Sequence, residues 1–125
     1  MQERCYLVYA LAPAGVGAAD ANEALNLYVA DERRGLAVWH DHFIGEQGGA
    51  VVLAVRGDDE RALLDDHGPL SGWRIAVHPL TFSLTAVGFA AQASLTLEEY
   101  RRVSLEELAA REPDDPRYWW KRRTS

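Results

Sequence analysis

The segment His40-Asp41-His42 places three proton-exchanging side chains together in an otherwise apolar stretch of the chain. Histidine exchanges protons readily near neutral pH, so either imidazole could act as a general base or hydrogen-bond donor toward a small molecule. Trp39 and Phe43 flank the three residues and could form the wall of a cavity. We therefore predict His40, Asp41 and His42 as catalytic candidates and Trp39 and Phe43 as ligand-binding candidates.

Strand alternation divides these residues between two faces of a sheet. His40 and His42 would share one face, with Cβ atoms about 6.5–7 Å apart. Trp39, Asp41 and Phe43 would share the other, so a cavity walled by the two aromatic rings would receive Asp41 rather than the histidines. Alternatively, the histidines are solvated residues of an edge strand, and the aromatic rings belong to the core.

Two histidines at this spacing could chelate a metal ion, but a mononuclear site normally needs a third or fourth protein ligand. His67 and His78 could supply one, yet the sequence does not bring them together. We keep both as ligand-binding candidates and expect neither a metal nor a cofactor. The pair Asp66-His67 has an equally simple structural interpretation, in which the histidine interacts with free carbonyl groups at a helix end.

Composition limits the class of protein. The chain has 125 residues, 48% of them hydrophobic and 26% charged, which is typical of one soluble domain. Its single cysteine is consistent with a reducing compartment, and no apolar run approaches the roughly 18 residues of a membrane span. The net charge of −6 disfavours binding to nucleic acid. We predict a cytoplasmic protein without nucleic-acid or membrane partners.

Four strands and two helices are expected to position the candidate residues. The strands are predicted at Cys5–Ala12, Leu36–Ile44, Ala50–Val55 and Trp73–Ser83. The first and third are apolar on both faces, which is typical of central strands, whereas the histidines of the second and Pro79 of the fourth favour edge positions. Helices are predicted to begin at Asp20 and Asp58, whose side chains could cap them, and Asp20 is followed by Glu23 as in a capping box.

The resulting order is strand, helix, strand, strand, helix, strand, a ferredoxin-like βαββαβ arrangement with a four-stranded antiparallel sheet. Over residues 5–83 this pattern resembles the domains of the dimeric α+β barrel superfamily, which includes small cofactor-free monooxygenases and muconolactone-isomerase-like proteins. The resemblance implies a homodimer of face-to-face sheets and a ligand cavity between each sheet and its helices. No motif selects a member family, so no catalytic residues are carried over.

The chain is predicted to continue beyond this domain. We assign residues 1–94 to the ferredoxin-like domain and residues 95–125 to a C-terminal helical extension that packs on the domain or on its dimer partner. The apolar segment Leu84–Ala93 is expected to add a short strand. Capping boxes at Thr96 and Ser104 predict two short helices, and Trp119-Trp120 is expected to dock rather than stack on nucleic acid.

Two functions are compatible with these features. The first is binding of a small, largely apolar organic molecule, with cofactor-free oxygenation or isomerase-like proton transfer at a cavity histidine. The second is a non-catalytic dimeric module in which the histidines and aromatic residues serve packing and assembly. In either case the two helices cover one face of the sheet, so the other apolar face predicts a homodimer.

Overall fold

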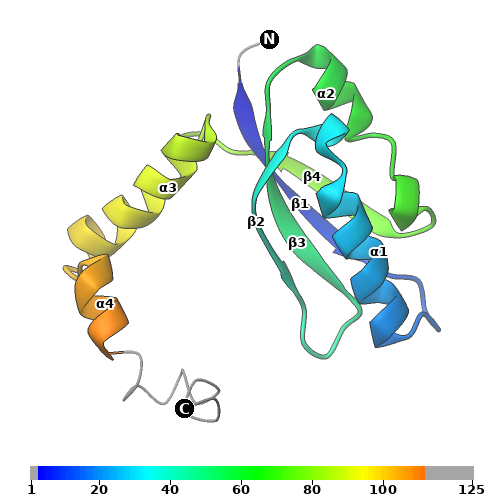
Figure 1. The fold of residues 1–125 in the computed structure, drawn as a ribbon, viewed down its shortest axis with the longest axis horizontal. Helices are drawn as coiled ribbons and strands as arrows, with labels where there is room; N and C mark the ends of the chain where they lie inside the picture. The colour runs from blue at the N-terminus through cyan, green and yellow to red at the C-terminus, as the bar shows by residue number, and fades with distance from the viewer. Residues whose placement is uncertain (1–2, 112–125) are drawn as a thin grey trace. The chain divides into compact units, whose positions relative to one another are not determined.

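The structure, a computed structural model, describes residues 3–111 (Figure 1). In chain order the elements are β1 (Arg4–Leu11), α1 (Ala18–Ala30), β2 (Leu36–His42), β3 (Gly48–Val55), α2 (Asp58–Leu63), β4 (Arg74–Pro79), α3 (Ala86–Leu95) and α4 (Leu105–Arg111). Short 3₁₀ turns lie at Glu32–Arg34 and Gly68–Leu70, and a π-helical turn at Thr96–Tyr100. Among the described residues, no helix is long and apolar enough to cross a membrane.

The four strands form one antiparallel sheet in the order β2-β3-β1-β4. The two strands formed by the continuous apolar runs therefore occupy the centre, and the strands with histidines or proline lie at the edges. This confirms the α+β class, the antiparallel sheet and the predicted central or edge position of each strand. The element order and the sheet are compatible with a ferredoxin-like fold.

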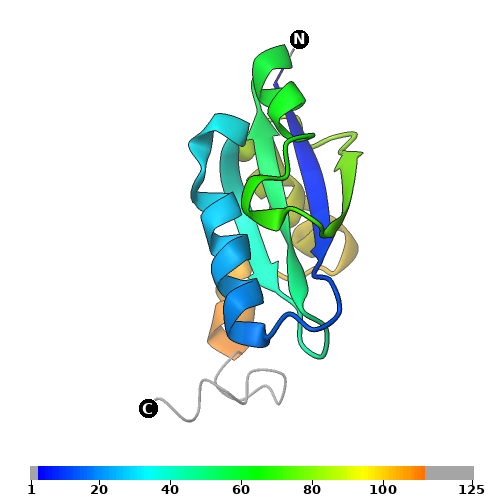
Figure 2. The same ribbon diagram turned by 90° about the vertical axis from the view of Figure 1, so that its right-hand side faces the viewer.

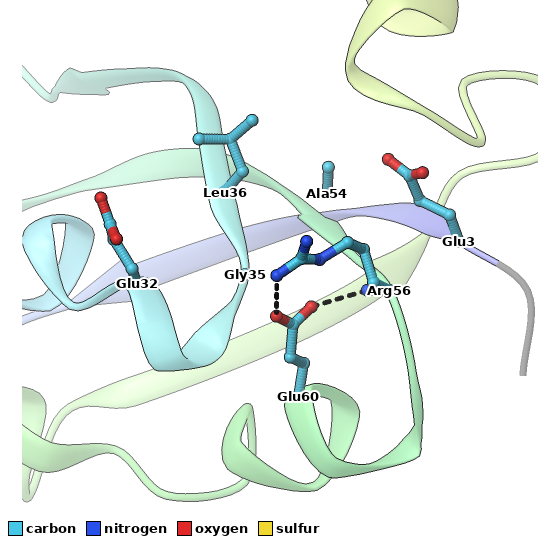
Figure 3. A pocket seen from close by; sticks show the side chains of 7 residues that line it. All are labelled: Glu3, Glu32, Gly35, Leu36, Ala54, Arg56 and Glu60. Atoms are coloured by element: carbon cyan, nitrogen blue, oxygen red, sulfur yellow. Dashed lines mark hydrogen bonds and ion pairs between the residues drawn. The ribbon is translucent and has the colours of Figure 1, made fainter.

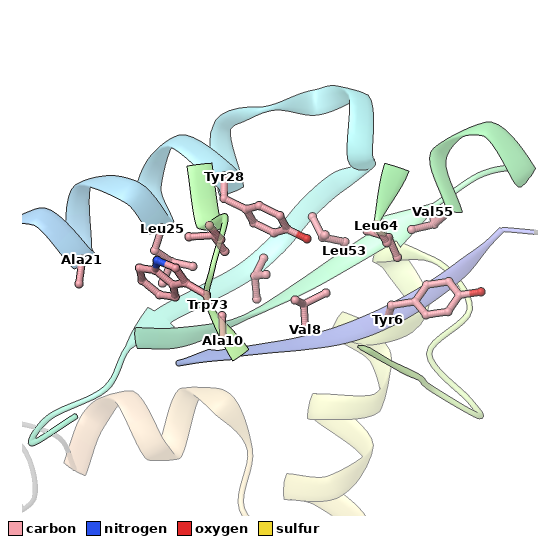
Figure 4. Close-up of a cluster of buried hydrophobic side chains, with 12 residues drawn as sticks. Tyr6, Val8, Ala10, Ala21, Leu25, Tyr28, Leu53, Val55, Leu64 and Trp73 are labelled. Carbon is pink, nitrogen blue, oxygen red and sulfur yellow. The ribbon is translucent and has the colours of Figure 1, made fainter. Parts of the chain in front are cut away.

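Both α1 and α2 cover the same face of the sheet (Figures 1 and 2). Between them and the strands lies the main hydrophobic core, in which α1 contributes Ala21, Leu25 and Tyr28 and the strands contribute alternate residues. Figure 4 shows these side chains filling the layer between helix and sheet. This is the layer in which the resemblance places a ligand cavity, and twelve buried side chains occupy it.

Neither α1 nor α2 begins as predicted. Helix α1 begins two residues before Asp20, with Gly17 as its N-cap, because the Gly17 carbonyl already accepts the Ala21 N–H at 2.9 Å. Asp20 lies in the first turn, where a carboxylate still favours the helix dipole. Gly57 caps α2, and Asp58 is its first residue.

The predicted short strand at Leu84–Ala93 is wrong, because this segment forms most of helix α3. Alanine, its commonest residue, is the strongest helix former. Thr85 starts the helix: its hydroxyl accepts the Gly88 N–H at 2.9 Å, and its carbonyl accepts the Phe89 N–H at 2.9 Å. Ser104 caps α4 as predicted, through the Glu107 N–H at 3.1 Å.

The chain divides into two compact units, residues 1–89 and residues 90–125. The first holds the sheet, α1, α2 and the first residues of α3. The second holds the remainder of α3 and α4. Trp119-Trp120 and the basic residues that follow lie outside the described residues.

Candidate functional site

The sheet has a second apolar face on the side away from α1 and α2. In β1, Tyr6, Val8 and Ala10 belong to the main core, so the alternating residues Cys5 and Leu7, and Tyr9 and Leu11 beyond them, point to the opposite side. We call this side the far face. The strands add Val52 and Ala54, which pack with Cys5 in a smaller apolar cluster that also includes residues of the segment 80–89.

A β-bulge at Val38 determines which residues of β2 reach the far face. Ala37 pairs with Leu53 and Trp39 pairs with Val52, so Val38 is an extra residue in the ladder. Val38 packs against the far-face cluster, and Trp39 lies opposite Val52 on the same side. Simple alternation along β2 would put Val38 on the same face as His40 and His42, but the bulge places it on the far face.

The far face contains an apolar hollow of about 270 Å³ lined by Leu7, Trp39, Val52, Leu80 and Phe89. Trp39 is 44% exposed, and the nearby Tyr9 is 40% exposed. The Tyr9 ring also contacts Phe43, with ring centroids 5.2 Å apart and planes tilted by 46°. Trp39 and Phe43, both predicted from the sequence to bind ligand, therefore belong to this face.

Cys5 lies at one end of the same face and is fully buried. Burial raises the pKa of its thiol, and the nearby Glu3 carboxylate raises it further. A thiol held in its neutral form is a weak nucleophile. Cys5 is therefore a packing residue of the far face.

Polar residues of the far face lie on its two edge strands. Asp41 pairs with Ala50, which in turn pairs with Tyr9, so Asp41 belongs to the far face on β2. On β4, His78 pairs with Leu7 and Arg74 pairs with Leu11. All three polar residues are exposed. Of the histidines, it is His78 whose register position lies beside the hollow.

His40 and His42 belong to the opposite, helix-covered side of β2. His40 pairs with Val51, a core residue, and His42 pairs with Gly49 beside α1. The His42 Nε2 atom lies 3.1 Å from the Asn26 Oδ1 atom of α1, and the two imidazole centroids are 5.7 Å apart. The predicted trio is thus divided between the two faces of the sheet, with His40 and His42 on one and Asp41 on the other, as strand alternation predicted.

Within residues 3–111, no group of three or more His, Cys, Asp or Glu side chains is placed to hold a metal ion. His67 lies in the turn between α2 and the Gly68–Leu70 turn. It is separated from His78, which lies on β4 with its register position on the far face. The four histidines of the sequence therefore do not converge.

Arg34, which the sequence did not indicate as a functional residue, is the largest fully buried side chain among residues 3–111. Its Nη1 atom donates to the Asp31 Oδ2 atom at 2.8 Å, its Nε atom donates to the Asp66 carbonyl at 3.1 Å, and its guanidinium lies 4.5 Å from the Tyr28 ring centroid. Gly68 has a φ of +49°, and a Cβ there would collide with the guanidinium. Asp66 and the turn after it therefore anchor Arg34, which ties α1 to the α2–β4 connection.

A second hollow, of about 220 Å³, lies near the start of β2 (Figure 3). Three glutamates and Arg56 contribute to its lining, together with Gly35, Leu36 and Ala54. Arg56 is already engaged, because its backbone N–H donates to the Glu60 carboxylate at 2.7 Å and its guanidinium lies 3.4 Å from it. A third hollow, of about 320 Å³, lies between the β1–α1 loop and the β2–β3 turn.

None of these three hollows has a histidine in its lining. The far-face hollow differs from the other two because its lining is entirely apolar and includes an exposed tryptophan. No protein-family model, curated protein or solved structure matches this chain. The far face is therefore the candidate site on the strength of its own geometry.

Proposed function

We propose that this protein binds a small apolar organic molecule in the far-face hollow of a homodimer, as a ferredoxin-like domain of the dimeric α+β barrel type. One observation carries the proposal: five apolar side chains line a hollow on a sheet face that neither α1 nor α2 covers. Specific small-molecule sites are typically concave and mostly apolar, with a few polar groups nearby. Asp41 and His78 supply such groups at the two edges.

Exposed aromatic surface supports the homodimer. An aromatic side chain of this size buries roughly 150–250 Å² when it packs, and each Å² of apolar surface removed from water contributes about 25 cal/mol. Trp39 at 44% exposure and Tyr9 at 40% leave much of that stabilisation unused in one chain. A second copy placed over the far face recovers it and closes the hollow against solvent.

Any proton transfer to a bound molecule falls to His78 in this proposal. Its pairing with Leu7 places it on the face of the hollow, whereas His40 and His42 occupy the helix-covered side. An imidazole is the side chain that most often serves as a general base. The cofactor-free monooxygenase or isomerase-like activity expected from the resemblance therefore depends on this one histidine.

Calorimetric titration with 1-naphthol, a small apolar probe, tests the binding site. The Leu7→Trp variant fills the hollow, whereas Leu36→Trp makes the same change on the same face outside its lining. We expect saturable binding to the wild type, at least about 10-fold weaker binding to Leu7→Trp, and a change below about 3-fold for Leu36→Trp. Equal affinities for the two variants, or no saturable binding to the wild type, would contradict the proposal.

The second candidate function is a non-catalytic dimeric module. It is favoured by the absence of a histidine from the linings of the three hollows described and by the filled layer between sheet and helices. It predicts a homodimer that gives no heat with the same probe. The titration therefore separates the two functions without knowledge of the natural ligand.

A further inference from the structure

The charged residues of the far face are distributed unequally between its edges. On β2 the far face has a carboxylate, Asp41, and on β4 it has a guanidinium, Arg74, and an imidazole, His78. Between these edges the face is apolar along β3 and β1, where Ala50 and Val52 lie beside Leu7 and Tyr9. One copy of the chain therefore presents an acidic edge, an apolar centre and a basic edge.

Asp41 and Arg74 cannot pair within one chain. They lie on strands at opposite edges of the sheet, three strand spacings apart, which is roughly 14 Å. Exposed charges at that separation are largely screened at physiological ionic strength. Among the ion pairs found within residues 3–111, none involves Asp41, Arg74 or His78.

We infer that a second copy covers the far face about a two-fold axis parallel to the strands, with Asp41 set against Arg74 and His78 of the partner subunit. This inference rests on the homodimer of the proposed function and specifies its geometry. Rotation about such an axis interchanges the two edges of the sheet and leaves each residue at the same position along the strand direction. β2 of one copy then lies over β4 of the other, so each acidic edge meets a basic edge.

Register determines which residues meet. Asp41 shares a cross-strand row with Ala50, Tyr9 and Ala76. The axis therefore sets Asp41 opposite Ala76 of the partner subunit, with Arg74 and His78 of the partner subunit two residues away on either side. Packed sheets lie about 10 Å apart, a gap that an arginine and an aspartate side chain can span together.

A two-fold axis that runs parallel to the sheet but perpendicular to the strands would pair like charges instead of opposite charges. It would set β2 over β2 and β4 over β4, bringing two Asp41 carboxylates to one edge and two Arg74 guanidinium groups to the other. Like charges across an interface are costly and select against such an arrangement. Charge complementarity therefore favours the axis parallel to the strands.

Charge reversal tests the geometry on the full chain. Native mass spectrometry over a dilution series would give dimer dissociation constants for the wild type, Asp41→Lys, Arg74→Glu and the double variant. We expect each single variant to weaken the dimer at least about 10-fold and the double variant to return within about 3-fold of the wild type. Glu23→Lys, on the exposed side of α1, makes the same charge change as Asp41→Lys and should have no effect.

The outcomes distinguish this inference from the proposed function. Restoration by the double variant supports the pairing, since the two residues are too far apart to compensate within one chain. A wild-type dimer that the single variants leave intact, or a double variant weaker than either single, overturns the pairing and leaves the homodimer standing. A monomeric wild type overturns both, whereas 1-naphthol binding is measured independently of either result.

Discussion

The two faces of this sheet are made by the same strands and are similarly apolar, yet they are completed in different ways. On one face, α1 brings Leu25 and Tyr28 over the strands, Leu64 at the end of α2 joins them, and the layer is filled. On the other, Trp39 and Tyr9 remain partly exposed around a hollow. The comparison indicates that the helix-covered face stabilises the fold, whereas the far face is available for binding and assembly.

A charge introduced on each face in turn tests this division. The charge on the helix-covered face should give the largest loss of stability of all the variants proposed. Val51 is fully buried on the helix-covered face, so Val51→Asp places an unpaired carboxylate in the core. We expect the free energy of unfolding to fall by about 4 kcal/mol or more, a large part of the stability of a domain. Circular dichroism and thermal melting would show loss of folded protein.

Tyr9→Asp is the matched change on the far face. Because Tyr9 is 40% exposed, we expect native secondary structure by circular dichroism but a weakened dimer. Similar unfolding by the two variants would remove the distinction between a folding face and a binding face.

Substitution of Arg34 should give the next largest loss of stability. Because Arg34 lies on the helix-covered side of the sheet, the substitution should not affect the dimer. Arg34→Met removes the buried guanidinium that bonds Asp31 and the Asp66 carbonyl. We expect a loss of about 2–4 kcal/mol in chemical denaturation, with dimerisation unchanged. Arg33→Met is the control: the Arg33 side chain is 72% exposed and its ion pair is screened by solvent, so its loss should destabilise the fold much less than the loss of Arg34. Equal losses would show that burial of Arg34 is not the reason for its effect.

Substitution of Asp31 should give the smallest loss of stability, and the size of this loss should depend on pH. The hydrogen bond from the Arg33 side chain, assisted by the charges of Arg33 and Arg34, holds the pKa of the Asp31 carboxyl well below its usual range. Its ionised form therefore stabilises the fold above the unfolded pKa near 4, and this contribution is lost as the pH falls toward the folded pKa. Denaturation at pH 7 and pH 3 should show a gap between the wild type and Asp31→Asn that narrows in acid; a gap independent of pH would contradict this.

Much of the fold was predictable because strand polarity and element order agree. Continuous apolar runs placed β1 and β3 at the centre, and the structure confirms this. The helix starts were less predictable, because Gly17 and Gly57 end the preceding loops without a side-chain cap. The α3 segment was mistaken for a strand because its apolar run has no clear periodicity, and its start depends on the single hydroxyl of Thr85.

The candidate site was only partly predictable. Trp39, Asp41, Phe43 and His78 belong to the far face, and strand alternation correctly grouped the first three. The bulge at Val38 is invisible to alternation, since an extra residue in a ladder depends on the register with β3. Arg34 was missed for a similar reason, because its partners Asp66 and Gly68 are more than thirty residues away.

The most direct test of the central claim is the mass of the wild-type chain in solution. Sedimentation equilibrium at micromolar concentration reports whether the far face is covered by a second copy. A homodimer predicts a species of twice 13.9 kDa. A species of 13.9 kDa at all concentrations would contradict it.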